Sequence, residues 1–198
     1  MKTIILATNN ADKVREIREM LAGGDIEILP LKEAGIDIDI EETGTTFEEN
    51  ALIKARAICK MTGKPALADD SGLCVDYLDG APGVYSSRFM GEDTPYSEKN
   101  AAIIEKLEGV EGEERAAAFK CCMAFVLPDG KEFVTMGEMK GVIADKPAGE
   151  NGFGYDPIVY LPEYGRTSAQ LSPDEKNAIS HRGEALRKMV GIINDKFC

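Results

Sequence analysis

The stretch "KTIILATNNADKVREIREMLAG" (Lys2–Gly23) decides the fold class. Lys2–Thr8 is an apolar run of strand length, and a helical pattern follows at once over Ala11–Gly23. The apolar positions of that pattern are Val14, Ile17 and Leu21. Gly23 is a typical helix stop. A strand that leads directly into a helix is typical of proteins that pack helices on a sheet.

Further helices are predicted from apolar periodicity and capping signals. They are expected at about Phe47–Met61, Tyr96–Leu107 and Ser180–Lys196. Thr45 and Glu48 have capping-box spacing before the first of these helices, and Gly63 ends it. "SPDE" (Ser172–Glu175) combines a Ser N-cap with Pro at the first helical position, which indicates another helix start.

Strands are predicted from buried apolar runs. "PALADD" (Pro65–Asp70) is one, and "PDG" (Pro128–Gly130) is a hairpin turn between two more, at Arg115–Leu127 and Lys131–Ile143. Mixed strands and helices with a hairpin imply an α/β or α+β fold with a mixed sheet. The 198 residues suffice for a single domain, 1–198, or for one domain split into two lobes by a cleft.

The composition limits the partners. The formal net charge of −12 argues against a general nucleic-acid surface, because phosphate backbones need clustered Lys and Arg. A small phosphorylated substrate stays compatible with this charge if local cations and a metal ion offset it. No apolar run is long enough to span a bilayer, and the N-terminus lacks the features of a signal peptide. We therefore expect neither a nucleic-acid nor a membrane partner.

The cysteines are odd in number and show no C-x-x-C spacing, which indicates neither a disulfide framework nor a zinc site. They are Cys59, Cys74, Cys121, Cys122 and Cys198. Cys121 and Cys122 are adjacent in a predicted strand and should point to opposite faces. Ordinary thiols in a reducing, cytoplasmic location are the expected state.

"TNNADK" (Thr8–Lys13) lies at the first strand-to-helix junction. A helix N-terminus presents free N–H groups and a positive dipole end, which suit phosphate, and Lys13 would add a counter-charge. The stretch lacks the G-x-x-x-x-G-K-[ST] pattern of a P-loop. Taken alone, it is explained better by Asn10 as a helix cap and by a solvated Lys13.

"ADDSG" (Ala68–Gly72) places two carboxylates at the end of a predicted strand, where α/β folds bind ligands. Neighbouring side chains on a strand point to opposite faces, so Asp69 and Asp70 should have different roles. A carboxylate that faces a ligand suits Mg²⁺, which prefers oxygen ligands. A plain turn with Gly72 at positive φ explains the stretch equally well.

"DIDIEETG" (Asp37–Gly44) is an acidic loop. Its first residues are expected on a solvated surface. Glu41 or Glu42 could complete a metal site with an aspartate of "ADDSG", and Lys54 in the next helix could add positive charge nearby.

"GENGFGYDP" (Gly149–Pro157) is a glycine-rich loop with two aromatic residues. Glycines let the backbone approach a ligand, and Phe153 or Tyr155 offers a ring on which a base could stack. Asp156 could accept a hydrogen bond from a base N–H or a sugar hydroxyl. The alternative is a tight loop whose aromatic side chains fill a core.

"NAISHRGEAL" (Asn177–Leu186) contains His181, the only histidine. Lys176, His181 and Arg182 lie around a predicted helix start, with Ser180 as the expected N-cap. Zinc is poorly supported because no second histidine exists, and a serine hydrolase would need a G-x-S-x-G elbow that is absent. A structural residue and a recognition group both remain open for His181.

The motifs are far more specific together than singly. "TNNADK", "EETG", "ADDSGL", "GAPGVYSSR", "FGYDP" and "EKNAISHRGEAL" occur in this order. Over nearly the whole chain, this order and spacing resembles the inosine triphosphate pyrophosphatase family, the dITP/XTP pyrophosphatases. The resemblance implies an α/β fold with an elongated, mixed, twisted β-sheet, flanking helices and two lobes around a central cleft. It also implies a homodimer.

The resemblance further implies Mg²⁺-dependent hydrolysis of ITP, dITP or XTP to monophosphate and pyrophosphate, which removes these nucleotides before their incorporation into DNA or RNA. Asp70 is then the catalytic base, and Glu41 with Asp70 binds the metal; Glu41 is chosen over Glu42 by its distance from Gly44. Substrate contacts are implied for Thr8, Asn9, Asn10, Ala11, Asp12, Lys13, Ser71, Phe153, Gly154, Tyr155, Asp156, Lys176, His181 and Arg182.

Specificity follows from base chemistry. Hypoxanthine and xanthine carry a 6-oxo group where adenine carries a 6-amino group, so a site that offers only donors there rejects adenine. His181 and Arg182 are the expected donors. Rejection of guanine, which shares the 6-oxo group, needs a wall or an unpartnered site for its 2-amino group.

Two other functions stay open on the sequence. One is a non-catalytic nucleotide-binding or sensing protein, although it would not need the carboxylates of "ADDSG" and Glu41. The other keeps the enzyme but changes the substrate, for example to modified pyrimidine triphosphates.

Overall fold

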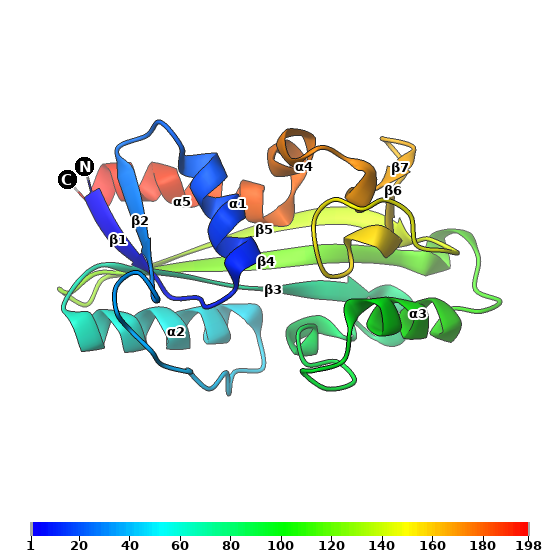
Figure 1. The fold of residues 1–198 in the computed structure, drawn as a ribbon, viewed down its shortest axis with the longest axis horizontal. Coiled ribbons are helices and arrows are strands. Elements are labelled where there is room, and N and C mark those ends of the chain that lie inside the picture. The colour runs from blue at the N-terminus through cyan, green and yellow to red at the C-terminus, as the bar shows by residue number, and fades with distance from the viewer. Residues whose placement is uncertain (1, 198) are drawn as a thin grey trace. The chain divides into compact units, whose positions relative to one another are not determined.

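The strands form one mixed sheet (Figure 1). The computed structural model describes residues 2–197, so Cys198 lies outside the described residues. Within that range the sheet has seven strands in the order β2-β1-β3-β4-β5-β6-β7. They are β1 (Lys2–Leu6), β2 (Ile26–Pro30), β3 (Ala66–Val75), β4 (Ala116–Val126), β5 (Glu132–Ile143), β6 (Val159–Leu161) and β7 (Arg166–Thr167). β1 pairs in parallel with β2 and β3, and β6 pairs antiparallel with β5 and β7, which confirms the mixed sheet.

All predicted helices are present. They are α1 (Ala11–Leu21), α2 (Phe47–Thr62), α3 (Tyr96–Lys106), α4 (Pro173–Ile179) and α5 (His181–Lys196). The capping box of α2 was predicted one residue too early. Thr46 and Glu49 form it, because the helix begins at Phe47 and Thr46 therefore takes the N-cap position.

The strand predicted over Pro65–Asp70 is longer than expected. β3 continues through "ADDSG" to Val75, so the plain turn considered for that stretch is wrong. The hairpin at "PDG" is confirmed, since β4 and β5 are neighbours in the sheet and the Leu127 N–H donates to the Lys131 carbonyl at 2.9 Å. The strands β2, β6 and β7 were missed. They are short, and β2 begins directly after a turn that follows α1.

Residues in contact with one another fall into two compact units. Unit 1 comprises Met1–Asp70, Cys121–Gly137 and Arg182–Cys198, and unit 2 comprises Ser71–Lys120 and Glu138–His181. The strands β3, β4 and β5 contribute residues to both units. A single functional domain and a central cleft stay predictions.

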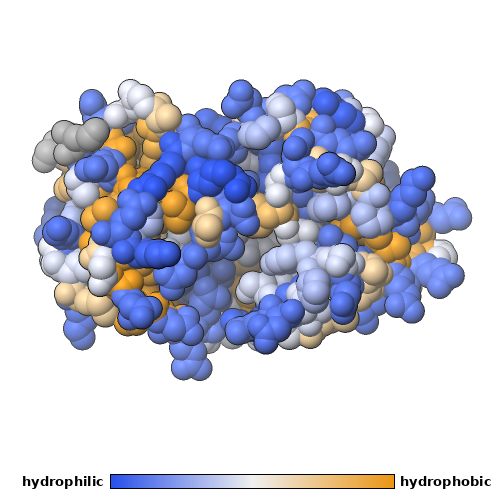
Figure 2. Space-filling model, viewed as in Figure 1, coloured by the Kyte–Doolittle hydropathy of each residue, from blue (hydrophilic) through white to orange (hydrophobic). Residues whose placement is uncertain are grey.

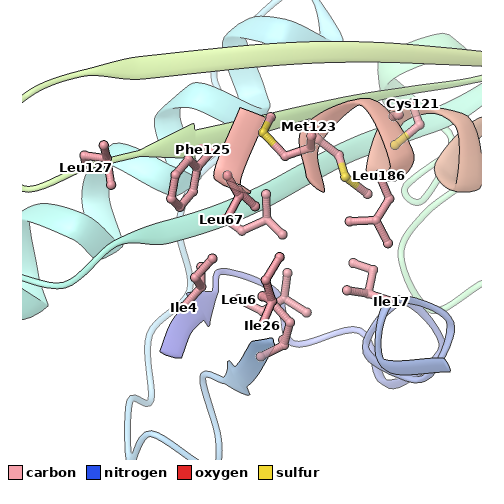
Figure 3. Close-up of a cluster of buried hydrophobic side chains, with 14 residues drawn as sticks. Ile4, Leu6, Ile17, Ile26, Leu67, Cys121, Met123, Phe125, Leu127 and Leu186 are labelled. Carbon is pink, nitrogen blue, oxygen red and sulfur yellow. The ribbon is translucent and has the colours of Figure 1, made fainter. Parts of the chain in front are cut away.

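The core of unit 1 lies between the strands and the two helices α1 and α5 (Figure 3). Ile4 and Leu6 of β1 and Leu67 of β3 meet Ile17 of α1 and Leu186 of α5 there. The helix α2 covers the other face of these strands (Figure 1). Its buried apolar residues include Ala51, Ala55 and Ile58. Each face of β3 in unit 1 thus meets different helices.

Cys121 and Cys122 show the same separation of faces. Both are buried, and only Cys121 belongs to the cluster beneath α1 and α5. Their predicted opposite orientation is confirmed. Burial raises the pKa of the Cys122 thiol to about 12, as expected for an unreactive thiol.

The core of unit 2 is built around α3. Ile103 and Leu107 of this helix pack with Leu73 of β3, Phe119 of β4 and Met139 of β5. The Arg115 guanidinium is buried beside this cluster and donates to four backbone carbonyls at 2.7–3.1 Å. Those carbonyls belong to Leu107, Val110, Ile143 and Ala144.

Hydrophilic residues cover most of the face drawn in Figure 2, and hydrophobic residues form small groups on it. In the range 2–197, no helix is both long enough and apolar enough to cross a bilayer.

Candidate functional site

The adjacent carboxylates of β3 point to opposite faces of the sheet. Asp69 contacts Lys13 of α1 and Arg182 of α5, on the face that carries Leu67. Asp70 accepts a hydrogen bond from Asn50 of α2, on the other face. The two aspartates have different surroundings because the pleat turns successive side chains to opposite sides, and their different roles stay a prediction.

Asp69 is the centre of a buried ion network. Its Oδ2 lies 3.0 Å from Lys13 Nζ, 3.3 Å from Arg182 Nη2 and 3.4 Å from Arg182 Nε. Arg182 Nη1 also donates to Glu16 Oε2 at 2.5 Å. Burial of Asp69 opposes ionisation, but Lys13 and Arg182 outweigh it and hold the pKa of this carboxyl well below its usual range. Two cations therefore balance two anions, as buried charges require.

The N-terminus of α1 holds Lys13 next to this network. Asn10 is the N-cap, and its Oδ1 accepts from the N–H groups of Asp12 at 2.9 Å and Lys13 at 3.1 Å. The Thr8 hydroxyl oxygen accepts from the Asn10 N–H at 3.2 Å. The capping role of Asn10 is thus confirmed, but Lys13 is not a solvated lysine. Its side chain is only 13 % exposed, and its ammonium is fixed by Asp69.

The remaining residues of "TNNADK" lie at the surface. Asn9 is exposed and its amide donates to the Ile38 carbonyl at 3.1 Å, which ties this turn to the acidic loop. Ala11 is exposed, and Asp12 pairs with Arg15 in the first turn of α1. The stretch therefore presents polar groups and a helix N-terminus around one held lysine, an arrangement suited to an anion.

Asp70 lies among three groups on the face covered by α2. Its Oδ2 accepts from Asn50 Nδ2 at 3.0 Å, and its Oδ1 lies 3.9 Å from Lys54 Nζ. Lys54 also donates to Glu42 Oε1 at 2.5 Å. Burial raises the pKa of Asp70 to about 6, with Lys54 lowering it and Glu42 raising it. Burial lowers the pKa of Lys54, but the charges of Asp70, Asp69 and Glu42 outweigh it and the net shift is upward.

The structure places Glu42, not Glu41, beside Lys54 and Asp70. Glu41 is exposed, while Glu42 is half-buried against Lys54. The choice of Glu41 as the metal ligand stays a prediction that geometry does not favour. Asp70 and Glu42 are carboxylates, which are the donors that Mg²⁺ prefers. Residues 2–197 contain no cluster of three or more metal-binding side chains.

Unit 2 organises the "FGYDP" loop around Asp156, which is 2 % exposed. Its Oδ2 accepts from Lys176 Nζ at 2.7 Å and from the Phe153 N–H at 2.8 Å, and its Oδ1 accepts from the Ser168 hydroxyl at 2.8 Å. Lys176 Nζ also lies 5.0 Å from the centre of the Phe153 ring. Asp156 therefore holds Lys176 and the loop backbone. These contacts do not support the expected hydrogen bond from a base N–H or a sugar hydroxyl, which stays a prediction.

The two aromatic residues of the loop separate into different roles. Tyr155 is buried in the unit 2 core, and its hydroxyl donates to the Ser86 carbonyl at 2.7 Å. Its ring meets Tyr96 edge-on at 5.2 Å between centroids. Phe153 is half-buried, and stacking of a base on its ring stays a prediction. A nucleotide contact by Tyr155 would have to come from its backbone, as would one by Gly154.

His181 and Arg182 are both buried, in different surroundings. His181 is 5 % exposed and stacks on Phe119, with ring centroids 5.0 Å apart and planes at 12°. Arg182 is 1 % exposed and directs its guanidinium nitrogens to carboxylates, as described above. Ser180 directly precedes α5 with the extended backbone of an N-cap, and Ser71 is half-buried on β3 next to Asp70. Base recognition by Arg182 stays a prediction without support from its contacts.

Sequence reasoning missed four residues of these clusters. They are Glu16, Asn50, Phe119 and Ser168. Glu16 lies three residues after Lys13 and Asn50 four residues before Lys54, so each shares a helix face with a predicted cation. That spacing was a usable signal. Phe119 and Ser168 are brought in by tertiary packing, and no local pattern marks them.

The comparisons with known proteins agree with the α/β fold described above. The model of the Ham1 family matches residues 4–192, and the chain belongs to this family. It is 49 % identical over 195 residues to a dITP/XTP pyrophosphatase of Clostridium perfringens, covering 96 % of each chain. This confirms the resemblance drawn from the motifs.

Solved structures show the same fold. A HAM1 protein from Coxiella burnetii is 45 % identical with a TM-score of 0.89, over 98 % of this chain and 100 % of that one. The Ham1 protein of Staphylococcus aureus is 39 % identical with a TM-score of 0.88, over the same shares.

Proposed function

We propose that this protein hydrolyses ITP, dITP and XTP to the monophosphate and pyrophosphate, and so removes them from the nucleotide pool. The observation that carries the proposal is the pair Lys13 and Lys54, whose side chains are 13 % and 11 % exposed and lie beside the two adjacent aspartates of β3. They supply positive charge for a triphosphate beside Asp70, a carboxylate able to act on water. The name of the Clostridium perfringens relative, dITP/XTP pyrophosphatase, supports the choice of substrate.

Mg²⁺ is the proposed cofactor. Two carboxylates fit this ion, which usually keeps several waters and binds one or two carboxylates together with substrate phosphates. Asp70 is one proposed ligand, and the second is one of the adjacent Glu41 and Glu42. When bound, the ion neutralises phosphate charge and polarises the oxygens that it contacts.

The protein's own groups then perform the remaining tasks. Asp70 orients the attacking water and accepts its proton as the water oxygen bonds to the α-phosphorus. Lys13 and Lys54 offset the charge of the triphosphate, which builds up on the departing pyrophosphate. Asp69 fixes Lys13 in place through their ion pair, so it acts through Lys13 rather than on the substrate.

Base recognition is proposed for residues of unit 2. Phe153 offers the ring for stacking, with Lys176 beside it. His181 is the proposed donor to the 6-oxo group, because its ring is fixed by Phe119. A fixed donor leaves the 6-amino group of adenine without an acceptor, and such buried mismatches discriminate by about 10⁴ or more.

The wider setting is also proposed. The whole chain acts as one nucleoside triphosphate pyrophosphatase domain, it works as a homodimer, and it is located in the cytoplasm. Analytical ultracentrifugation of the purified protein tests the dimer directly.

A substrate panel tests the function. Pyrophosphate and inorganic phosphate are both quantified after incubation with ITP, dITP, XTP, ATP, GTP and dUTP in the presence of Mg²⁺. Pyrophosphate release from the first three substrates, with little from ATP and GTP, is expected. Nucleotide binding without release from any substrate would favour a sensor, and a preference for dUTP would favour a pyrimidine enzyme. Asp70→Asn should abolish release and keep the circular dichroism spectrum of the wild type.

A matched pair of variants decides between the two glutamates. Glu41→Gln and Glu42→Gln are compared by the Mg²⁺ concentration that gives half-maximal activity. The variant that loses the true ligand should need markedly more Mg²⁺, and geometry favours Glu42→Gln. A larger effect in Glu41→Gln would support the position chosen from the motif.

A further inference from the structure

Asn50 connects Asp70 to the loop that carries the two candidate metal-binding glutamates. Its Nδ2 donates to Asp70 Oδ2 at 3.0 Å, and its Oδ1 accepts from the Gly44 N–H at 2.8 Å. We propose that Asn50 is a positioning residue, which sets the orientation of the Asp70 carboxylate and locks the "EETG" turn against it. This inference rests on the proposed function, because it assigns Asn50 a role in that reaction.

The chemistry of the partners fixes which way the amide of Asn50 faces. A backbone N–H such as that of Gly44 can only donate, so it requires the oxygen of the amide. The NH₂ group of Asn50 must then face Asp70, and a carboxylate oxygen accepts it. The Asn50 amide thus uses its oxygen for Gly44 and its NH₂ group for Asp70. Exchanging the two groups by a flip of the amide would lose both hydrogen bonds.

This contact leaves the two oxygens of Asp70 with different surroundings. Oδ2 is tied to Asn50, while Oδ1 lies 3.9 Å from Lys54 Nζ. Asn50 is 0 % exposed, so water does not compete for its hydrogen bonds. The hydrogen bond from Asn50 therefore favours one rotation of the Asp70 carboxylate.

Gly44 is shaped for this contact. A Cβ added there would lie 2.6 Å from Asn50 Oδ1 and 2.6 Å from the Glu49 Cβ, distances that real Cβ atoms essentially never show. Only glycine therefore lets the turn approach α2 closely enough for the N–H to reach Asn50. Asn50 thus joins the turn that follows Glu41 and Glu42 to Asp70, and Lys54 makes a second connection between Glu42 and Asp70.

The helix gives Asn50 a rigid base. The capping box formed by Thr46 and Glu49 fixes the first turn of α2, where Asn50 lies. Lys54 follows four residues later on the same helix face. One rigid face of α2 therefore presents both an amide and an ammonium to Asp70, which is how preorganised sites keep a reacting group in place.

The test compares Asn50→Asp with the wild type and with a control substitution on the same helix that does not touch Asp70. Asn50→Asp keeps an acceptor for Gly44 but loses the donor to Asp70. Misplacing a reacting group by about 1 Å can cost about 100-fold in rate, so kcat for ITP should fall about 10- to 100-fold. KM should change by less than about threefold, since the groups proposed to bind the nucleotide are untouched.

Ile58→Val is the control. Ile58 is fully buried on α2, two turns beyond Asn50, and its shortening destabilises the helix packing without touching Asp70. It should lower the unfolding temperature and leave kcat unchanged. Equal kcat values for Asn50→Asp, Ile58→Val and the wild type would overturn the proposal, as would a loss for Asn50→Asp that lies entirely in KM.

Two further measurements test the proposal without relying on Asn50→Asp alone. Gly44→Ala disturbs the same contact from the loop side and should lower kcat in the same direction, which keeps the proposal testable if Asn50→Asp does not fold. Hydrogen exchange at the Gly44 amide gives a readout that does not depend on activity. Exchange should be slow in the wild type and at least about tenfold faster in Asn50→Ser, because the half-buried N–H loses its acceptor. Unchanged exchange would contradict the contact.

The outcomes separate this inference from the function on which it rests. A wild type that releases no pyrophosphate from any substrate would overturn both. An active wild type whose Asn50→Asp and Gly44→Ala variants keep full kcat would overturn the role of Asn50 alone.

Discussion

Arg182→Met is predicted to destabilise the protein strongly. Arg182 is 1 % exposed and joins Glu16 of α1 to Asp69 of β3. Methionine has a similar length and keeps the packing, so the variant removes the charge and the fork of hydrogen bonds with little change in volume. Two buried carboxylates then share only Lys13 as a nearby cation of this network.

The magnitude follows from the burial. Asp69 is 0 % and Glu16 is 5 % exposed, so neither carboxylate can recover its hydration. Removing one partner of a buried ion pair costs about 3–5 kcal/mol. For a chain of this size each kcal/mol lowers Tm by about 2–4 °C, which gives an expected decrease of about 6–20 °C.

Thermal unfolding followed by circular dichroism measures this change. Arg18→Met, which removes an exposed ion pair with Glu33, is the matched control and should unfold close to the wild type. The double variant Arg182→Met, Glu16→Gln should recover part of the loss, because it removes one anion together with the cation. A Tm for Arg182→Met within about 2 °C of the wild type would refute the reasoning and return Arg182 to base recognition.

Three further predictions concern recognition and stability. His181→Ala should lower kcat/KM for ITP by a larger factor than kcat/KM for ATP. Equal proportional losses on both substrates would count against a recognition role. Gly152→Ala should raise KM for ITP, because the added Cβ would lie 2.1 Å from Asp156 Oδ2 at a positive φ of 73°; steady-state kinetics would show it, and an unchanged KM would contradict it. Hydrogen bonds from Thr45 lower the pKa of Glu49, so its stabilisation is present above the unfolded pKa and is lost as pH falls through the folded one. Glu49→Gln should therefore be less stable than the wild type at neutral pH, and the difference in unfolding free energy should shrink as the pH falls, as measured by urea unfolding.

The helices and the long strands could be predicted because their signals are local. Apolar spacing and caps placed α1, α2, α3 and α5 within a residue or two of their observed bounds. The strand β3 was cut short at Asp70 because its polar residues look like a turn. They are tolerated in a buried strand only because Lys13, Arg182 and Asn50 satisfy them, and that is a tertiary fact.

For the candidate site, the sequence indicated which residues to consider better than it indicated their contacts. The motifs included Lys13, Asp70 and Lys176, which the structure holds in ion pairs or hydrogen bonds with partners from other elements. They also included Arg182 and Asp156, whose polar atoms contact other groups of the protein, and substrate contacts by these two residues stay predictions. Sequence spacing shows which residues share a face, but it does not show which hydrogen-bond donors are left over for a ligand.

The roles of the two aspartates are decided by the helices that cover β3, not by the strand itself. In "ADDSG" the two carboxylates are chemically equal, and the pleat sends one to each face. Asp69 meets two cations there, so protonating it would break two ion pairs, and it is a poor proton acceptor. Asp70 meets a neutral amide and a lysine that is shared with Glu42, so it keeps more of its basicity. An exchange of the helices' charges, with a cation at Asn50 and a neutral residue at Lys13, would therefore move the more basic carboxylate to Asp69.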